Sequence, residues 1–349
     1  MKKLILILII IAAAVYFFMS GDQIDQVASS KSQGTSPASE TEAGTASSQS
    51  ETIKLGDELD EDEEYEEVDI RPATEVYSNS EEAFEAVKKG AQDYDDIILE
   101  QFVEIKDCEW CGEFYKSVTE SMLDSSSSED EQSYYSEILA ISGNPEQIKT
   151  LVESIKNAKN EAQADLFAES LELALGGDDV VIYLKDELKN TSDPLLKESL
   201  VAAVTNQGSR LAAETLYEHT VASGDPNGYY DVGIGLGELV PEDEALPYLQ
   251  ELVQKRDDYS GLAFKALLNQ GVTGLQMAMD ELENSKDPEF DKKMIQDAVD
   301  HVAYEEDVEA YLNELVKNTN DQNVKDFAKE ILEELAIEED ELDSEEDLN

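Results

Sequence analysis

Two cysteines, separated by two residues, carry the clearest chemical motif in this sequence: Cys108-Glu109-Trp110-Cys111. Such a pair can close a local disulfide, carry out thiol–disulfide exchange, or supply half of a zinc site shared between two chains. The neighbouring carboxylates of Asp107 and Glu109 disfavour the thiolate that exchange chemistry needs. We therefore expect a structural disulfide, with thiol exchange, an intersubunit metal site and free thiols as alternatives.

The rest of the sequence offers little catalytic chemistry. Its two histidines, His219 and His301, lie on separate predicted helices, and neither has a nucleophile pattern nearby. We nominate no catalytic residue, no cofactor and no metal ligand within one chain. The protein is therefore predicted not to be an enzyme, and thiol–disulfide chemistry at Cys108 and Cys111 is the one enzymatic alternative.

The charge balance narrows the range of partners. The 349 residues include 25 Lys and Arg against 82 Asp and Glu, for a formal net charge of −57. So acidic a surface argues against binding nucleic acid or anionic lipid, because both need a positive field. A salty habitat or a basic protein partner would each account for the acidity.

The first 21 residues have the character of a targeting segment. Lys2 and Lys3 precede an uncharged apolar run that just reaches the length of a membrane span. A single-pass inner-membrane anchor and a cleaved signal peptide both fit. We therefore place the bulk of the chain outside the cytoplasm in a bacterial cell envelope, with membrane contact through residues 1–21 only. Cleavage would instead leave a periplasmic or secreted protein.

Two segments lack the composition of a packed core. Residues 22–80 begin rich in Ser, Thr, Ala and Gly and continue into a dense run of Asp and Glu. Residues 338–349 carry many acids and no base. Such segments bury too little apolar surface to offset the entropy of ordering. We predict a disordered linker and a disordered acidic tail.

Helical periodicity fills the part between these segments. We predict a helical N-terminal cap over residues 81–143, which carries the cysteine pair, and a repeat array over residues 144–337. Asn or Asp anchors recur every 30 to 33 residues, and apolar side chains recur seven and eleven residues after each anchor and five before it, with Thr220 as the one exception. The anchors are Asn160, Asp193, Asp225, Asp257, Asp287 and Asn320. Each unit is predicted to be two antiparallel helices, the second of them beginning near residues 161, 194, 226, 258, 288 and 322.

The stretch from Leu188 to Val204 carries a family resemblance. An Asp193-Pro194 joint is followed by Leu196-Lys197 and an Ala-rich helix, so that the segment resembles a short HEAT-like repeat of the phycobilisome-lyase type. The resemblance implies an all-α, right-handed solenoid of about six helix pairs that serves as a protein-binding scaffold. It implies no lyase activity for this chain.

Four aromatic side chains on predicted second helices are candidate anchors for a protein partner: Tyr229, Tyr230, Tyr259 and Phe290. Partial burial against the next repeat is the alternative for each. The predicted function is a membrane-anchored scaffold or adaptor in the cell envelope. The rivals are a thiol–disulfide protein and a halophilic structural protein with no specific partner. The sequence leaves the oligomeric state and the partner's identity open.

Overall fold

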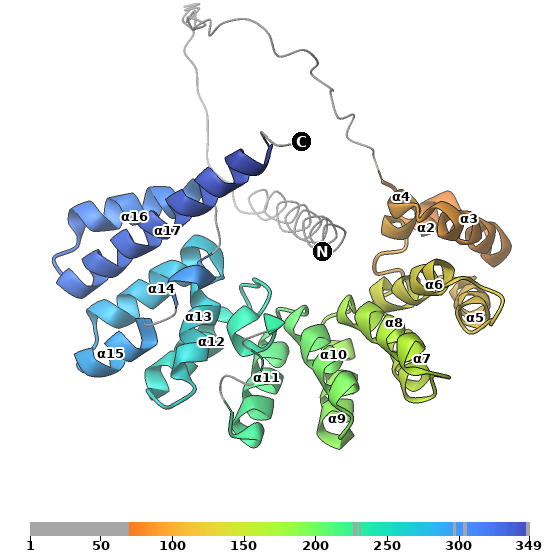
Figure 1. Cartoon of the computed structure of the whole chain (residues 1–349), viewed down its shortest axis with the longest axis horizontal. Helices are drawn as coiled ribbons and strands as arrows, with labels where there is room; N and C mark the ends of the chain where they lie inside the picture. The colour runs from red at the N-terminus through yellow and green to blue at the C-terminus, as the bar shows by residue number, and fades with distance from the viewer. Residues whose placement is uncertain (1–69, 226–228, 230–231, 296–297, 303–305, 347–349) are drawn as a thin grey trace, which may run out of the picture. The chain divides into compact units, whose positions relative to one another are not determined.

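The computed structural model describes residues 70–225, 229, 232–295, 298–302 and 306–346. The chain divides into two units, Met1–Tyr65 and Glu66–Asn349, and every described residue belongs to the second. The described residues form helices and no strand, which confirms the all-α prediction for this part of the chain (Figure 1).

The helices follow one another with short joints. Their bounds are α2 Ala73–Val76, α3 Ser80–Asp93, α4 Asp96–Glu100, α5 Cys111–Met122, α6 Glu129–Ile141, α7 Pro145–Lys156, α8 Glu161–Glu172, α9 Asp178–Asn190, α10 Pro194–Thr205, α11 Arg210–Ser223, α12 Leu246–Lys255, α13 Ser260–Leu268, α14 Gly271–Glu283, α15 Pro288–Ile295, α16 Glu306–Asn318 and α17 Gln322–Glu346. Two 3₁₀ helices are η2 Leu236–Glu238 and η3 Val299–His301.

Short polar side chains start several of these helices, at the joints that the sequence predicts. Asn144 and Asn160 each accept a hydrogen bond of 2.9 Å from a backbone N–H in the first turn of α7 or α8. Asp193 does the same for α10 at 3.1 Å. Pro145 and Pro194 occupy the first helical position, where no N–H donor is needed. The predicted joints are confirmed at these three positions.

The helices pack against near neighbours along the chain, in two rows (Figure 1). In the first-helix row, α7 contacts α9, α9 contacts α11, α11 contacts α12, α12 contacts α14, and α14 contacts α16. In the second-helix row, α6 contacts α8, α8 contacts α10, α13 contacts η2 and α15, and η3 contacts α17. The two rows also contact each other, as α7 contacts α8 and α16 contacts α17. No single helix could bury its apolar face without these neighbours.

Burial tests the predicted register directly. Of the positions seven and eleven after each anchor and five before it, all are buried except Val232, which is 51% exposed, and Leu315, which is half-buried. The buried set is Ile155, Phe167, Leu171, Leu188, Leu200, Val204, Thr220, Leu236, Leu252, Phe264, Leu268, Leu282, Met294, Ala298, Phe327 and Ile331. The predicted register places these positions on one face of each helix, and their burial confirms it.

One predicted second helix is not found. We expected a helix from about residue 226, but the described residues 232–245 contain only η2. Gly233 and Gly235 have φ angles of +65° and +104°, which no α-helix accommodates. These glycines turn the backbone where the predicted helix would have run. Leu236 still reaches its predicted buried position from η2, and Val232 does not.

An Asn-Gln-Gly tripeptide follows both α10 and α13 and joins neighbouring helix pairs. After α10, Gln207 Nε2 donates to Ala174 O in the preceding pair, and Gln207 Oε1 accepts from Gly177 N at 2.8 Å. Gln270, after α13, makes both bonds again, to Leu239 O at 3.1 Å and from Glu242 N at 2.7 Å. The two buried amides therefore fix the spacing between successive pairs.

Two predicted segment boundaries are wrong. We placed residues up to 80 in the disordered linker, but α2 packs on the cap: Ala73 is fully buried and its N–H donates to Gln101 O at 2.7 Å. We placed residues from 338 in a disordered tail, whereas α17 continues to Glu346. The tail is rich in Glu, which favours helix once a preceding turn exists.

None of the helices in the described residues is long and apolar enough to cross a membrane. The predicted anchor or signal, residues 1–21, lies outside the described residues. So do residues 22–69 of the predicted linker and residues 347–349 of the predicted tail.

Candidate functional site

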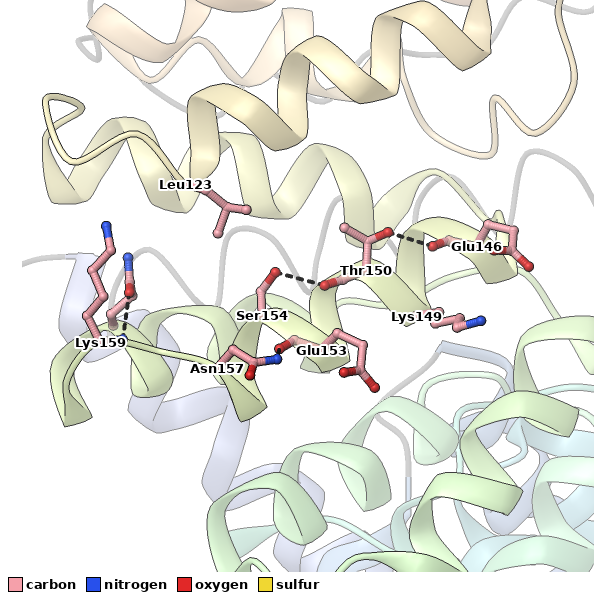
Figure 2. A pocket seen from close by; sticks show the side chains of 9 residues that line it. Leu123, Glu146, Lys149, Thr150, Glu153, Ser154, Asn157 and Lys159 are labelled. Carbon is pink, nitrogen blue, oxygen red and sulfur yellow. Dashed lines mark hydrogen bonds between the residues drawn. The ribbon is translucent and has the colours of Figure 1, made fainter.

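A groove of about 540 Å³ lies along α7 near the end of α5 (Figure 2). Leu123, the first residue after α5, is 43% exposed and points toward α7 across this space. Lys159 and Gln163 line its far end. The α7 side contributes residues at intervals of three and four, which place them on one helix face. They are Glu146, Lys149, Thr150, Glu153, Ser154 and Asn157.

The small polar side chains in the groove already have partners in their own helix. Thr150 Oγ1 donates to Glu146 O at 2.9 Å, and Ser154 Oγ donates to Thr150 O at 2.8 Å (Figure 2). Asn157 Nδ2 likewise donates to Glu153 O at 2.7 Å. Because these groups are satisfied, the groove can accept an apolar group beside Thr150 and Ser154 without orphaning a hydroxyl.

The next repeat explains why the groove is open. The 33-residue register from Gly143 to Gly176 aligns Thr150 with Tyr183 and Ser154 with Glu187. Burial, and then the charge of Glu187, raises the pKa of Tyr183, which lies at the junction of α9 with α7. The large side chains of Tyr183 and Glu187 occupy the junction between α7 and α9. The small side chains of Thr150 and Ser154 leave the equivalent space open on the cap side of α7.

The helix that should fill this space is displaced. By the pattern of the first-helix row, α5 would pack on α7 as α7 packs on α9, yet α5 packs mainly on α3 and on α6, its own pair partner. In the part of the chain that the structure describes, no hydrogen bond or ion pair joins α5 to α7. The face of α7 toward the cap is thus the unfilled helix position of the row.

Two lysines, Lys149 and Lys159, line the groove together with two glutamates, Glu146 and Glu153. Among the described residues, no ion pair forms at Lys149 or Lys159. The pKa of Asp124 is lowered, first by hydrogen bonds from Ser126 and to a smaller extent by Lys159. Glu153 is already paired with Lys156 at 3.3 Å, so the two lysines are the groove's cations that can bind a carboxylate of a partner.

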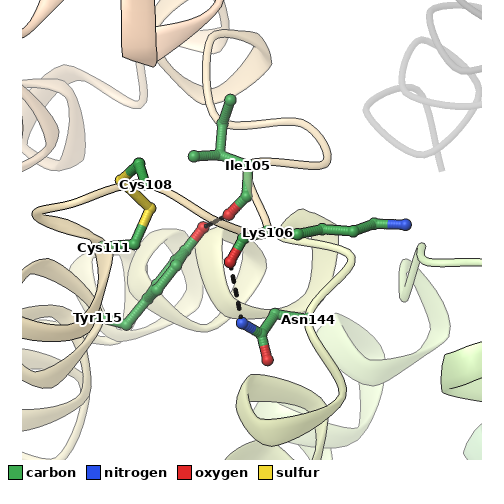
Figure 3. Close-up of a disulfide and its surroundings, with 6 residues drawn as sticks. All are labelled: Ile105, Lys106, Cys108, Cys111, Tyr115 and Asn144. Carbon is green, nitrogen blue, oxygen red and sulfur yellow. Dashed lines mark hydrogen bonds between the residues drawn. A yellow bond between two sulfur atoms is a disulfide. The ribbon is translucent and has the colours of Figure 1, made fainter.

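The two cysteines lie just before and at the start of α5, where they form a disulfide (Figure 3). Cys111 is the first residue of the helix, and its N–H donates to Cys108 O at 3.2 Å. Trp110, at the N-cap position, makes no side-chain cap bond. The disulfide therefore lies where other helices of this chain have an Asn, Asp or Ser cap.

The residues before the disulfide connect the cap to the first repeat. Tyr115 OH donates to Ile105 O at 2.6 Å, and Asn144 Nδ2 donates to Lys106 O at 3.2 Å (Figure 3). Glu104 N donates to Ile141 O at 2.8 Å. This loop thus contacts α5 on one side and the α6–α7 joint on the other.

The aromatic residues near the cysteines belong to the core of the cap. Phe114 is fully buried and stacks on Phe102 with ring centroids 4.8 Å apart. Trp110 meets Phe114 edge-on at 5.5 Å, and Tyr115 is buried against the same ring. These aromatic side chains therefore pack against one another in the core of the cap.

The predicted partner anchors do not form one surface. Tyr229 OH lies 2.9 Å from Nε2 of His219, on α11. Tyr259 packs edge-on against Tyr217, also on α11, at 6.1 Å. Tyr217 and His219 are two residues apart and therefore about 200° apart around that helix. Tyr229 and Tyr259 consequently lie against different faces of α11.

Phe290 and Tyr230 complete the set of predicted anchors. Phe290 lies half-buried under the Arg256 guanidinium, 5.7 Å from the ring centroid. Arg256 also pairs with the buried Asp291 at 2.7 Å. This ring therefore takes part in a contact between helix pairs. Tyr230 lies outside the described residues.

Neither metal chemistry nor relatives define the site. Within the described residues, no group of three or more His, Cys, Asp or Glu side chains is arranged to hold a metal ion. Comparison with models of known protein families finds no match, and comparison with curated proteins finds none either. The groove and the disulfide loop are therefore judged on their own geometry.

Sequence reasoning missed the groove although a signal was present. Aligning the repeats by their glycines would have shown Thr150 and Ser154 at the positions of Tyr183 and Glu187. That comparison predicts a difference in volume, but the displacement of α5 is visible only in the tertiary structure.

Proposed function

We propose that this chain is a non-enzymatic adaptor of the bacterial cell envelope that binds a partner protein. In this proposal residues 1–21 anchor or export the chain, and the helix pairs form a right-handed HEAT-like solenoid. Its support is the packing of each helix pair on its neighbours, because stacked pairs generate long surfaces suited to protein ligands.

The partner docks a helix in the groove along α7. The observation that carries this assignment is the unfilled helix position between α5 and α7, beside the small side chains of Thr150 and Ser154. The docked helix presents a large apolar or aromatic side chain to Thr150, as Tyr183 is presented to α7 from the other side. A carboxylate of the partner pairs with Lys149 or Lys159.

Filling the groove from within tests this assignment. The full chain, tagged at its C-terminus, is expressed in the native host and recovered under non-reducing conditions with an alkylating agent present. Thr150→Tyr places in the groove the side chain that the next repeat carries at the equivalent position. We expect the wild type to retain a stoichiometric partner and this variant to lose at least about 90% of it.

Ile182→Tyr provides the matched control. Ile182 aligns with Lys149, is 56% exposed, and lies on α9 outside the groove. The control is expected to capture the partner as the wild type does. Equal capture by Thr150→Tyr, with an unchanged melting temperature, would rule out the groove. Loss in both variants would show that the effect is not specific to it.

The aromatic anchors predicted from the sequence are the rival surface for the same function. Tyr229 is the most informative of them because it is half-buried and its hydroxyl bonds to His219 at 2.9 Å. Capture that survives Thr150→Tyr and fails with Tyr229→Ala would move the interface to the α11–α12 segment. The chain would then still be an adaptor, but it would bind its partner through the α11–α12 segment and not through the groove.

Thiol–disulfide exchange is the second candidate function, favoured by the half-buried position of Cys108. It predicts partners held as mixed disulfides through one cysteine, and accumulation of these adducts in Cys111→Ser. Partners recovered only in this covalent form would replace the adaptor by a thiol enzyme.

A further inference from the structure

The loop between α4 and α5, residues 101–110, supports the cap from one side. We call it the strut. It bonds to the end of α6 through Glu104 N and Ile141 O, at 2.8 Å, and to the α6–α7 joint through Asn144 Nδ2 and Lys106 O, at 3.2 Å. Lys106 Nζ reaches Gly176 O at 3.4 Å, in the following repeat. One short loop thus joins the cap to two successive helix pairs.

The fit at this contact is tight. Gly143 and Gly176 have φ angles of +66° and +131°, and their Cα atoms lie where a side chain would collide with neighbouring atoms. An added Cβ on Gly143 would lie 2.6 Å from Lys106 Cε, and one on Gly176 would lie 2.7 Å from Gly143 O. The same Cβ on Gly143 would lie 3.5 Å from Glu104 Cα, so the strut backbone passes close to this glycine.

Two features fix the path of the strut: the backbone conformation of Glu104 and the disulfide. Glu104 is one of the non-glycine residues held in the left-handed region, with φ at +54°. At the other end, the disulfide ties Cys108 in the strut to Cys111 in α5, which has no side-chain cap. Tyr115 OH adds a buried bond to Ile105 O. Without the disulfide, and apart from the chain itself, only non-covalent contacts join the strut to α5, among them the Tyr115–Ile105 bond, the bond from Cys111 N to Cys108 O, and the stacking of Phe102 on Phe114.

We propose that the Cys108–Cys111 disulfide is a redox-controlled brace that seats the cap on the repeats. When closed, it holds the strut against α6, Asn144 and Gly176. When opened by a dithiol reductant, it releases the strut and loosens the cap while α8 to α17 stay folded. This inference goes beyond the proposed function and does not depend on any partner.

The exchange follows from the exposure of the two sulfur-bearing residues. Cys108 is half-buried and Cys111 is 5% exposed, so the reductant's thiolate attacks Cys108 Sγ. The S–S bond breaks, and Cys111 leaves as a thiolate that takes up a proton. The reductant's second thiol then displaces Cys108, which also leaves as a thiol. The reductant becomes an intramolecular disulfide, and two electrons and two protons have moved to the protein.

Hydrogen exchange read by mass spectrometry tests the brace in the full chain. Oxidised protein is compared with protein treated with dithiothreitol, a dithiol. We expect the amides of residues 103–111 and 141–144 to exchange at least about tenfold faster after reduction. The amides of α13, which contact neither the strut nor the cap, are expected to be unchanged.

A double variant, Cys108→Ser with Cys111→Ser, gives the control. It is expected to show fast exchange at residues 103–111 with or without dithiothreitol, so the effect tracks the disulfide and not the reagent. Unchanged exchange on reduction of the wild type would overturn the proposal. Faster exchange throughout α7 to α17 would overturn it equally, because the disulfide would then stabilise the whole array. The wild-type comparison stands even if the double variant fails to fold.

Discussion

In the first-helix row, charged side chains reach from one helix to the next, whereas neutral amides make the links beside the second-helix row. Lys156 on α7 pairs with Glu187 on α9 at 2.7 Å, and Lys185 on α9 pairs with Glu218 on α11 at 3.0 Å. Near α10, by contrast, Gln207 bonds to two backbone groups of the preceding pair.

The difference reflects how few cations this chain has. Its 25 basic residues cannot neutralise 82 acids, and several of them are used where first helices meet. Lys255 lies 4.4 Å from the Tyr217 ring centroid, between α12 and α11. In the second-helix row, carboxylates come together with less compensation. Burial, and then the charge of Glu198, raises the pKa of Glu172 to about 7. One row is therefore expected to respond to salt, and the other to pH.

The largest expected effect comes from removing a buried amide of the second-helix row. Gln207→Ala leaves Ala174 O and Gly177 N without this partner in a buried setting. We expect a loss of about 2 kcal/mol in the free energy of unfolding, measured by urea titration, because unsatisfied buried polar groups cost that order.

The matched change is Gln254→Ala in the first-helix row. Gln254 is exposed and donates to Glu281 at 2.6 Å. This variant should change the free energy of unfolding by less than about 0.5 kcal/mol. Equal losses in the two variants would contradict the difference between the rows.

A smaller effect with the opposite sign is expected at Glu172. A carboxyl whose folded pKa of about 7 exceeds its ordinary value of 4.5 binds its proton more tightly when folded. Its stabilising contribution is therefore present below about pH 4.5 and is lost as the pH rises through 7. Glu172→Gln should raise the free energy of unfolding at pH 8 by about 1 kcal/mol, after allowance for solvent on its exposed side.

The pH profile separates this effect from a packing change. At pH 4.5, wild type and Glu172→Gln should unfold at nearly the same urea concentration, since Glu172 is then protonated in the folded state. A gain of the same size at both pH values would show that the variant acts through something other than titration.

The smallest expected effect is at the ion pair of the first-helix row. Lys156→Met removes a bond to Glu187 from a side chain that is 35% exposed. We expect a loss of about 0.5 kcal/mol at low salt, which shrinks toward zero near 1 M NaCl. A loss that persists in high salt would mean that the lysine acts through its methylene packing and not through its charge.

Helix pairing and register could be read from the sequence because they depend on local spacing. A residue such as Phe167 or Leu200 is buried because its helix face repeats, and Asn160 or Asp193 begins the next helix through its own side chain. These are effects of neighbours along the chain. The resemblance to HEAT-like repeats rested on the same features.

The failures occurred where distant contacts decide the outcome. The glycines at 233 and 235 fit either a close helix contact or a turn, and the loop returns to pair Val240 N with Thr205 O at 3.1 Å. Phe290 lies on α15 and Tyr259 at the N-cap of α13, and their packing on Arg256 and Tyr217 depends on the adjacent pair. Spacing along one helix carries no information about such contacts.

The sequence by itself determined an all-helical fold for the described part of the chain, the burial pattern of its repeats, and the closeness of two cysteines three positions apart. These follow from periodicity, capping and chain connectivity, which act over a few residues. Only the tertiary structure decided that α5 packs on α3 and α6 and not on α7, leaving the groove open. The position of a helix depends on the summed packing of all its neighbours, and no local pattern contains that sum.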